Sequence, residues 1–572
     1  MTPTIEREKS PAEEKVLLLL LPFWSPLIPP MGISCLKAVL QQHGCAVKAV
    51  DINIEQEFRK LYDEYFEILR EVISEDKTGN FYNIGNDVLR NHMMVYLYYA
   101  DEKECERSIK IFIQKNFFCG ADSPQLSRLN EILKEFYDRL RRYLLNLIEK
   151  ERPTVLGISV FNGTLPASLF SFKLVKENYS YIQTVMGGGI FADDLAIGSD
   201  NFEFFLEKTP YIDKIIIGEG ENLFLNFIQQ RLPESKRVYT LEDIDGELVD
   251  LAHAGLPDFS DFDLQFYPNL AAYTSRGCPF RCSFCSESVR WGSYRKKKAV
   301  QIVGEMKELY QKYGYQLFLM CDSLLNPVVT ELAEEFVRAE SSLYWDGYLR
   351  VDRAACNREN TLMWRRGGFY RARLGVESGS QRVLAAMRKG INPDQIFSSV
   401  ASLAYAGIKT TTYWVIGHPG ETEEDFQCTL NLIEKLADDI YEADCNPFNY
   451  YIGGQANSNQ WQVENRAVPL YQEVEKEALM MPTWILDTEP NREEIYNRVH
   501  RFVQHCRELG IPNPYSLHDI YKADERWKIL HRNSVPSLVE LKMKGTYLVE
   551  NKNVKHIVYK EKLPFHDNNW GF

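Results

Sequence analysis

The stretch Ser275-Arg-Gly-Cys-Pro-Phe-Arg-Cys-Ser-Phe-Cys-Ser286 places Cys278, Cys282 and Cys285 in a C-x3-C-x2-C spacing. This spacing can hold three irons of a [4Fe-4S] cluster, and the segment offers no fourth Cys or His for the last iron. Electron-transfer clusters usually take four thiolates, and structural zinc sites close with four nitrogen or sulfur ligands. The triplet therefore predicts an open iron that a substrate completes. With 12 cysteines in 572 residues, roughly 0.005 chance matches are expected, and redox-active or buried-core cysteines are the alternative interpretation.

Four short motifs follow the cysteines, each at the end of a segment whose pattern predicts a strand. The segments are 316–322, 344–352, 370–379 and 408–417, and a helix-period stretch over 300–313 precedes the first. The motifs are Asp322-Ser323, Arg350, Glu377-Ser378 and the run Ile416-Gly-His-Pro-Gly-Glu421. Strands that alternate with helices of about 10 to 15 residues indicate a parallel sheet, and the ligand sites of such barrels collect where the strands end.

The cysteine spacing, the preceding Arg276-Gly277 and the aromatic Phe284 resemble the radical S-adenosylmethionine (SAM) superfamily. In that family the SAM amino and carboxylate groups chelate the open iron, and one electron from the cluster cleaves the sulfonium to give a 5′-deoxyadenosyl radical. The resemblance implies a partial (β/α)6 barrel over 270–451, with Cys278, Cys282 and Cys285 as the catalytic cluster ligands. Asp322 stands where the family more often has Glu. The implied SAM contacts are Phe284, Asp322, Ser323, Arg350, Glu377, Ser378, Ile416, Gly417 and Glu421.

Residues 1–241 predict a second α/β unit of the doubly wound, Rossmann-like type. A buried-strand run over 15–21 leads through a proline-rich loop into a helix over 31–44 and a strand over 46–52. Further strands are predicted over 154–160, 181–186 and 214–217, each followed by a turn with glycine. Ligands of doubly wound sheets sit outside the carboxyl ends of the strands, so these turns are the candidate site.

This pattern resembles the cobalamin-binding domain that precedes the barrel in class B radical SAM methylases. The cobalamin contacts that the resemblance implies are Pro29, Pro30, Gly32, Phe161, Asn162, Gly163, Gly187, Gly188, Gly189, Gly218, Glu219, Gly220 and Glu221. The D-x-H-x-x-G element that supplies a histidine to cobalt is absent, because His43, His92 and His253 lack the flanking pattern. We therefore expect cobalamin bound base-off, without a histidine ligand. The alternative is a flavodoxin-like fold that holds no corrin.

Three other regions complete the predicted organisation. An insertion over 53–150 within the first domain shows helical periodicity at 55–74, 88–99 and 125–148 and is read as an amphipathic cover, a cofactor cap or a docking site for another chain. A linker without regular period spans 242–269. A helical C-terminal domain over 452–572, with helices at 470–479, 492–509 and 516–527, is expected to close the barrel mouth.

Composition narrows the function classes. The chain is 45% hydrophobic and 26% charged, which are globular values, and its net charge of −14 argues against a nucleic-acid substrate. The basic run over 294–298 is expected to be solvated or to dock an anionic partner or reductase. The five-leucine run over 17–21 is too short to span a bilayer and lacks a cleavage site. An oxygen-sensitive cluster fits a reducing cytoplasm, and flavodoxin or ferredoxin is the expected electron donor.

These features predict a cobalamin-dependent radical SAM methyltransferase. It would use a 5′-deoxyadenosyl radical and methylcobalamin to methylate an unactivated carbon of a peptide or another natural-product substrate, with peptide tailoring slightly preferred to small-molecule antibiotic or lipid tailoring. A second enzymatic interpretation drops the methyl transfer and leaves a radical cyclisation or rearrangement. The non-enzymatic alternative is a SAM- or corrin-binding regulator.

Overall fold

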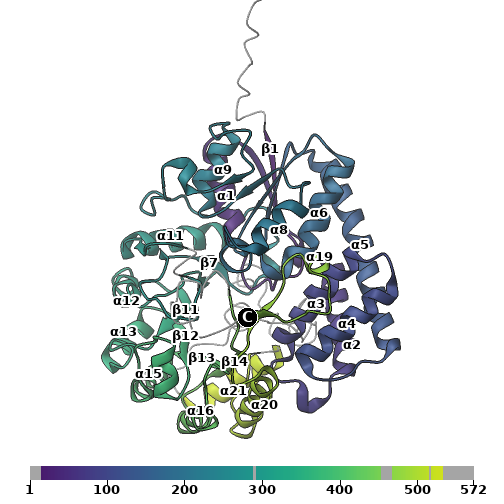
Figure 1. Ribbon diagram of the computed structural model, residues 1–572. Coiled ribbons are helices and arrows are strands. Elements are labelled where there is room, and N and C mark those ends of the chain that lie inside the picture. The colour runs from purple at the N-terminus through teal and green to yellow at the C-terminus, as the bar shows by residue number, and fades with distance from the viewer. Residues whose placement is uncertain (1–13, 288–290, 452–466, 515–516, 532–572) are drawn as a thin grey trace, which may run out of the picture.

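Two parallel sheets of six strands each organise the chain, and the computed structural model describes residues 14–287, 291–451, 467–514 and 517–531. Figure 1 shows the first sheet with its helices above the second sheet. A separate group of helices, from the segment 53–150, lies on the side of the molecule opposite the helices of the second sheet. The predicted α/β class, with a doubly wound unit followed by a partial barrel, is confirmed. The predicted domain boundaries themselves stay predictions.

The first sheet has the order β2-β1-β3-β4-β5-β6, and all its strand pairs are parallel. Its strands are β1 (Lys15–Leu20), β2 (Ala46–Asp51), β3 (Val155–Ser159), β4 (Gln183–Gly187), β5 (Lys214–Ile216) and β6 (Val238–Tyr239). The helices between them are α1 (Met31–Gln42), α6 (Leu165–Asn178), α7 (Ile190–Asp193), α8 (Asp200–Lys208) and α9 (Gly220–Ile228). The strand order reverses between β1 and β3, so the loops after these two strands flank the switch point where such sheets bind ligands.

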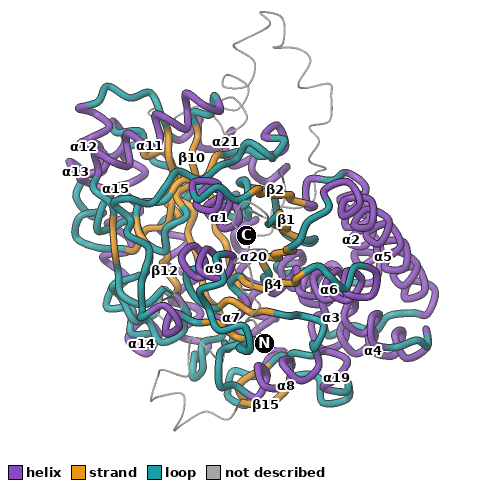
Figure 2. The backbone as a smooth tube through the Cα atoms, turned by 90° about the horizontal axis from the view of Figure 1, so that it is seen from above, coloured by secondary structure: helices purple, strands orange, loops and turns teal. Residues whose placement is uncertain are grey.

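The predicted insertion forms a layer of four helices, one more than the sequence pattern indicated. They are α2 (Gln56–Val72), α3 (Phe81–Tyr98), α4 (Glu102–Phe117) and α5 (Ser123–Glu151). Figures 1 and 2 agree that this layer lies on the opposite side of the molecule from the barrel helices. Helix α3 contacts both sheets. At its N-cap, the amide of Asn80 donates to the carbonyl oxygen of Cys445, in the second sheet, at 3.0 Å. Arg90 donates at 2.6 Å to Asn162, in the loop that follows strand Val155–Ser159 of the first sheet.

The second sheet keeps its strands in chain order, β14-β13-β12-β11-β10-β7, as expected for a partial barrel. The strands are β7 (Leu270–Ala272), β10 (Leu317–Met320), β11 (Tyr344–Arg350), β12 (Phe369–Glu377), β13 (Lys409–Ile416) and β14 (Glu442–Pro447). The helices are α11 (Ala299–Tyr313), α12 (Val329–Arg338), α13 (Arg358–Arg366), α14 (Gln381–Ala386), α15 (Pro393–Tyr405) and α16 (Glu423–Lys435). A short hairpin of β8 (Ser275–Arg276) and β9 (Arg295–Lys296) carries the cysteine loop.

The C-terminal region is less helical than predicted. Helices α20 (Arg492–Glu508) and α21 (Leu517–Leu530) match the expected ones. The predicted helix over 470–479 is wrong except for its last turn, α19 (Lys476–Leu479), because β15 (Ala467–Pro469) pairs with β16 (Trp484–Leu486) around this segment. Residues 452–466 and 532–572 of the predicted domain lie outside the described residues. No described helix is long and apolar enough to cross a membrane.

Candidate active site

The cysteine loop is anchored where β7 and β10 end. Asp322 accepts hydrogen bonds from the backbone nitrogen of Thr274 at 2.9 Å, from the Thr274 hydroxyl at 2.6 Å and from the Ser275 hydroxyl at 2.5 Å. Gly277, next to Cys278, has a φ of +86°, and a Cβ there would lie 3.2 Å from the carbonyl oxygen of Ser293. A glycine is therefore required at the point where the chain leaves β8.

These contacts change the interpretation of Asp322. Its side chain is buried, and burial raises the pKa of its carboxyl group. Since both oxygens accept bonds from Thr274 and at least one from Ser275, the carboxylate holds the start of the cysteine loop rather than facing an open site. Its neighbour Ser323 donates to Glu287, two residues after Cys285. The direct SAM contact predicted for Asp322 is not supported by this geometry, although Ser323 does face the loop.

The three cysteine thiols lie within electrostatic range of one another. Burial, with a smaller contribution from the charges of the neighbouring cysteines, raises the pKa of the Cys278 thiol and raises that of Cys285 to about 12. No three described His, Cys, Asp or Glu side chains converge on a single metal ion. The triplet instead suits a cluster, in which each thiolate binds its own iron, and metal binding would have to displace the thiol protons.

Arg350 contacts the cysteine loop at the end of β11. Its guanidinium donates a hydrogen bond to the sulfur of Cys282 at 3.4 Å and lies 4.1 Å from the ring centroid of Phe280. Arg350 is itself buried, whereas Phe280 is 39% exposed. Hydrogen bonds to cluster sulfurs are one of the factors that set reduction potential. Arg350, predicted as a SAM contact, thus contacts Cys282, one of the three predicted cluster ligands.

Glu377 forms a buried ion pair at the end of β12. Its carboxylate accepts from the ammonium group of Lys389 at 2.6 Å, and Lys389 also lies 5.9 Å from the ring of Phe284 in the cysteine loop. Glu377 has a φ of +64°, a left-handed conformation that non-glycine residues adopt rarely and that concentrates at functional sites. A Cβ at Gly375 would lie 2.7 Å from the Glu377 carboxylate, so a glycine makes room for the pair.

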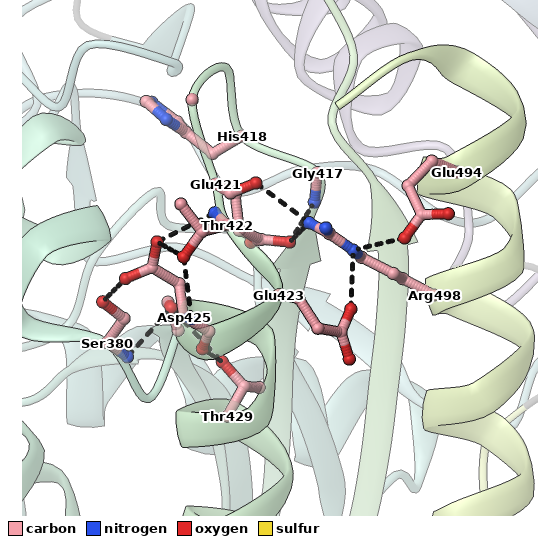
Figure 3. Close-up of polar contacts among 12 residues, drawn as sticks. Ser380, Gly417, His418, Glu421, Thr422, Glu423, Asp425, Thr429, Glu494 and Arg498 are labelled. Atoms are coloured by element: carbon pink, nitrogen blue, oxygen red, sulfur yellow. Dashed lines mark hydrogen bonds and ion pairs between the residues drawn. The ribbon is translucent and has the colours of Figure 1, made fainter. Parts of the chain in front are cut away.

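The loop after Glu377 is fixed by α16, as Figure 3 shows. Ser380 donates to Asp425, and the backbone nitrogen of Gly379 donates to the hydroxyl of Thr429 at 2.9 Å. The Ser378 hydroxyl lies 3.3 Å from that of Thr429 and accepts from the Ser380 backbone. Ser378, predicted as a SAM contact, therefore uses its side chain to position the loop.

A second network holds the loop at the end of β13 (Figure 3). Glu421 accepts from the backbone nitrogen of Gly417 and from the guanidinium of Arg498, both at 3.1 Å, and its other carboxylate oxygen is buried without a hydrogen-bond partner. Burial raises the pKa of Glu421 to about 7, although the Gly417 hydrogen bond and Arg498 oppose this shift. A Cβ at Gly417 would lie 2.3 Å from Ile495 of α20. Helix α20 thus packs directly on the predicted adenine loop.

The carboxyl edge of the first sheet carries an aromatic pair at its switch point. Trp24, after β1, stacks on Phe161, after β3, with ring centroids 4.5 Å apart, and Trp24 is 46% exposed. At least one glycine of this edge is required by the backbone rather than by a ligand, because a Cβ at Gly188 would lie 2.4 Å from the carbonyl oxygen of Val160. Pro29 is buried, Gly32 is exposed at the start of α1, and a Cβ there would meet nothing within 4 Å.

Two predicted cobalamin contacts bind the cysteine hairpin instead. Glu221 pairs with Arg276, and Glu219 pairs with both Arg295 and Arg276, the latter at 3.3 Å. Both glutamates are buried, and their carboxylates are engaged in these ion pairs. The sequence suggested a cofactor role because the Gly-Glu-Gly-Glu turn follows β5. The structure shows that this turn binds the hairpin around the cysteine loop, through Arg276 and Arg295.

The basic run over 294–298 is solvated only in part, at the exposed Lys296 and Lys298. Arg295 is engaged by Glu219, and Lys297 is buried, pairs with Glu305 at 2.6 Å and lies 3.7 Å from the ring centroid of Tyr273. Lys296 is exposed and pairs with Glu331 at 3.2 Å. The docking role considered for this run is therefore contradicted for Arg295 and Lys297.

Several residues of the site were missed by sequence reasoning. Lys389, Arg498 and Arg90 stand in helical or loop segments without any motif, and each acts on a residue distant in sequence. Trp24 lies inside the predicted proline-rich loop and could have been singled out as a large aromatic residue at a strand end.

Comparison with known proteins defines the class of the second unit. The sequence model of the Radical SAM superfamily matches residues 273–433. This segment is a radical SAM domain, and a [4Fe-4S] cluster and SAM are the cofactors that such a domain implies.

Two curated relatives extend the likeness beyond that domain. The chain is 26% identical over 353 residues to the anaerobic magnesium-protoporphyrin IX monomethyl ester cyclase of Cereibacter sphaeroides, which covers 55% of each protein. It is 26% identical over 312 residues to the cobalamin-dependent radical SAM methyltransferase TokK of Streptomyces tokunonensis, which covers 48% of this chain and 44% of that protein. The chain spans about half to two thirds of the length of the first curated relatives that it matches.

The whole fold resembles that of the radical S-adenosylmethionine methyltransferase TsrM from Kitasatospora setae. The TM-score is 0.59 at 14% identity, over 87% of this chain and 89% of that one. A second structure of TsrM, with cobalamin and a [4Fe-4S] cluster bound, gives a TM-score of 0.55 at 15% identity, over 93% of this chain and 99% of that one. The likeness concerns the fold, and it covers the first sheet as well as the barrel.

Proposed function

We propose that this protein is a cobalamin-dependent radical SAM methyltransferase that methylates an unactivated carbon of a peptide or another natural-product substrate. One observation carries the proposal: Glu219 and Glu221, at the carboxyl edge of the first sheet, bind Arg276 two residues before Cys278. The ligand edge of the first sheet therefore adjoins the cluster loop of the barrel. Two cofactors held at these edges would meet between the sheets.

The bound groups would supply the chemistry, the cluster by reducing SAM to a 5′-deoxyadenosyl radical and cobalamin by donating a methyl group. The chain's own residues position the reactants. We infer that Cys278, Cys282 and Cys285 bind the cluster and that Glu377 and the loop from Ile416 to Glu421 bind the ribose and adenine of SAM. Lys389, paired with Glu377 at 2.6 Å, offers an ammonium group close to the site expected for the SAM carboxylate.

For cobalamin we assign the switch point of the first sheet. Trp24 and Phe161 form a stacked aromatic surface there, and a Cβ at Gly32, at the start of α1, would meet nothing within 4 Å. His92, the histidine of the helical insertion, is buried, and its ring nitrogens lie at hydrogen-bond distance from Tyr65 and Asn130. We therefore keep the expectation that the corrin binds base-off with no histidine on cobalt.

A second candidate is a radical cyclisation or rearrangement without methyl transfer. The cyclase of Cereibacter sphaeroides, at 26% identity, favours it. The two candidates differ in the fate of SAM. A methyltransferase forms S-adenosylhomocysteine as well as 5′-deoxyadenosine, whereas a cyclase forms 5′-deoxyadenosine without S-adenosylhomocysteine.

The test is an anaerobic assay of the protein reconstituted with iron, sulfide and cobalamin, given SAM and a low-potential reductant. We expect about four irons per chain, slow release of 5′-deoxyadenosine, and about one S-adenosylhomocysteine per bound corrin even without substrate. The Cys282→Ala variant should lose the cluster and 5′-deoxyadenosine. Retained corrin with no S-adenosylhomocysteine would overturn methyl transfer and favour cyclisation.

We further propose that a small acidic redox protein, flavodoxin or ferredoxin, supplies the electron. Phe280 and the exposed Arg281 lie on the outer side of the cysteine loop, where such a donor could approach the cluster. An oxygen-sensitive cluster of this kind needs a reducing compartment, so we expect the protein to act in the cytoplasm.

A further inference from the structure

The inner face of the second sheet carries a set of side chains that the SAM site does not use. On a parallel sheet, residues paired in register point to the same face, and alternate residues point to opposite faces. Trp345 of β11 packs against Phe336 of α12, which places it on the helix-covered face. Tyr348, an odd number of residues further along the strand, therefore faces inward. Its register partner Arg373 shares that face.

Access to this inner face changes sharply along the strands. Asp346, two residues before Tyr348 on the same face, is 0% exposed, and Arg373, the register partner of Tyr348, is 2% exposed. Tyr348 itself is 40% exposed although β11 lies inside the sheet. The inward residues at the level of Tyr348 and just above it are also partly exposed, namely Cys321, Gly375, Tyr413, Val415 and Asn446. A closed floor thus lies beneath an accessible layer, and the accessible layer is made of two phenol rings, a glycine and small side chains.

The floor beneath this layer carries no surplus positive charge, and Asp444, buried on the same face as the register partner of Tyr413, adds a carboxylate. Its buried cations are each matched by one carboxylate, in the pairs Arg373–Asp346 at 3.0 Å, Arg371–Glu442 at 2.6 Å and Lys409–Asp524 at 2.5 Å. A phosphate or carboxylate would find no free cation among these pairs. The aromatic rings are different: Tyr348 and Tyr413 have centroids 5.8 Å apart, and Gly375, the register partner of Tyr413, adds no side chain beside them. Arg373 lies against both rings, donating to the Tyr413 hydroxyl at 3.4 Å and lying 5.9 Å from the Tyr348 ring centroid.

We propose that Tyr348 and Tyr413 bind an uncharged aromatic ring of the substrate, next to the carbon that loses its hydrogen. The inference rests on the proposed function, because it assumes that a radical forms above the sheet. Tyr348 precedes Arg350 by two residues on one face of β11, a step of about 6.6 Å, and Arg350 contacts the cluster ligand Cys282. Gly375 lies two residues before Glu377 on β12, where the strand register shifts. A ring on the two tyrosines would therefore lie directly below the expected SAM site.

The test uses the intact chain, reconstituted anaerobically, and indole as a neutral aromatic probe beside cyclohexanol and inorganic phosphate. Equilibrium binding is measured by saturation-transfer NMR for the wild type and for the Tyr348→Leu, Tyr413→Leu and Tyr348→Phe variants. We expect wild type to bind indole better than the other probes, each leucine variant to weaken binding at least tenfold, and Tyr348→Phe to retain it. Tyr405→Leu, on the exposed surface of α15, is the matched control and should change nothing.

Iron content, thermal midpoint and SAM affinity are measured in the same variants. They should be unchanged, which would show that the fold and cofactor site are intact. Indole binding that survives both leucine changes, or is absent in wild type, would overturn the proposal. A parallel loss of SAM affinity would also overturn it, because the tyrosines would then hold the adenine of SAM. Failure of the proposed function would appear separately, as absence of 5′-deoxyadenosine formation by wild type with indole binding unaffected.

Discussion

At the scale of single residues, the contact between Arg350 and Cys282 links the end of β11 to the expected cluster. A positive hydrogen-bond donor at a cluster thiolate favours the reduced, more negative cluster. We predict that Arg350→Met lowers the reduction potential by about 60 mV, a tenfold change in the equilibrium of a one-electron couple. Redox titration followed by electron paramagnetic resonance measures it. Arg353→Met, on the exposed surface three residues further on, should leave the potential unchanged; an equal shift in both variants would contradict the assignment.

Glu421 makes a prediction about pH. With a pKa of about 7 in the folded protein and an ordinary value near 4.5, it keeps its proton between these pH values while the unfolded chain has released it. Stability should therefore fall as pH rises from 4.5 to 7, by at most about 3 kcal/mol. Glu421→Gln should remove this dependence and raise the thermal midpoint by several degrees at pH 8, with no gain at pH 4.5. Parallel pH profiles of the two proteins would refute the shifted pKa.

The residue scale also shows what a sequence can and cannot reveal. The cysteines and Glu377 were predicted because a local spacing or a strand-end motif marks them. Lys389 and Arg498 were not, since their partners are fixed only by folding: Arg498 reaches Glu421 across 77 positions. Asp322 and Glu219 were singled out, but their contacts within the protein were not predicted, because a sequence shows a carboxylate at a strand end without showing which neighbour it will bind.

At the scale of elements, α20 is the support of the predicted adenine loop. Arg498 donates to both the backbone and the side chain of Glu421, and Arg501, one turn further along α20, forms an exposed pair with Glu423. We predict that Arg498→Met weakens SAM binding about tenfold, or about 1.4 kcal/mol, with the iron content unchanged. Isothermal titration of the reconstituted protein measures this. Arg501→Met is the control, because exposed pairs contribute about 0 to 1 kcal/mol; equal losses in both variants would argue against a specific role of α20.

Elements with strong local patterns were predicted well. The strand and helix at 15–44 and the strands of the barrel agree with the structure within a few residues. Helix α4 was missed although Ile109, Phe112 and Ile113 bury one face of it and Asp101 caps it, a signal that the sequence does contain. The segment over 470–479 was misread because the pairing of β15 with β16 joins residues about 17 positions apart, which local periodicity does not report.

At the scale of the whole molecule, the two sheets are coupled through Arg276 and Arg295. Removing the partners of a buried charge lowers the free energy of unfolding by about 3 to 5 kcal/mol. We predict that the double variant Glu219→Gln, Glu221→Gln loosens the cysteine loop, so that hydrogen exchange of residues 274–280 rises and the reconstituted iron content falls. The exposed pair between Lys296 of the same hairpin and Glu331 of α12 gives the control Glu331→Gln, which should behave as wild type. Unchanged exchange in the double variant would show that the pairs do not hold the loop.

The topology of the two sheets determines where each one would hold its ligand. Each parallel sheet collects its ligand loops at one edge, and the buried ion pairs place one edge beside the other. The barrel could be anticipated from its cysteines and strand spacing, and the first sheet from its glycine turns. The ion pairs that connect the barrel to the first sheet could not be anticipated, because they form between side chains that belong to different sheets.

The measurement that tests the central claim most directly is electron paramagnetic resonance of the intact chain, purified after loading with cob(II)alamin. The account predicts close to one corrin per chain and a base-off spectrum without nitrogen splitting. The reason is that the first domain lacks the D-x-H-x-x-G element that would supply a histidine to cobalt. A protein that retains no corrin, or a spectrum with a strong axial-nitrogen triplet, would contradict it.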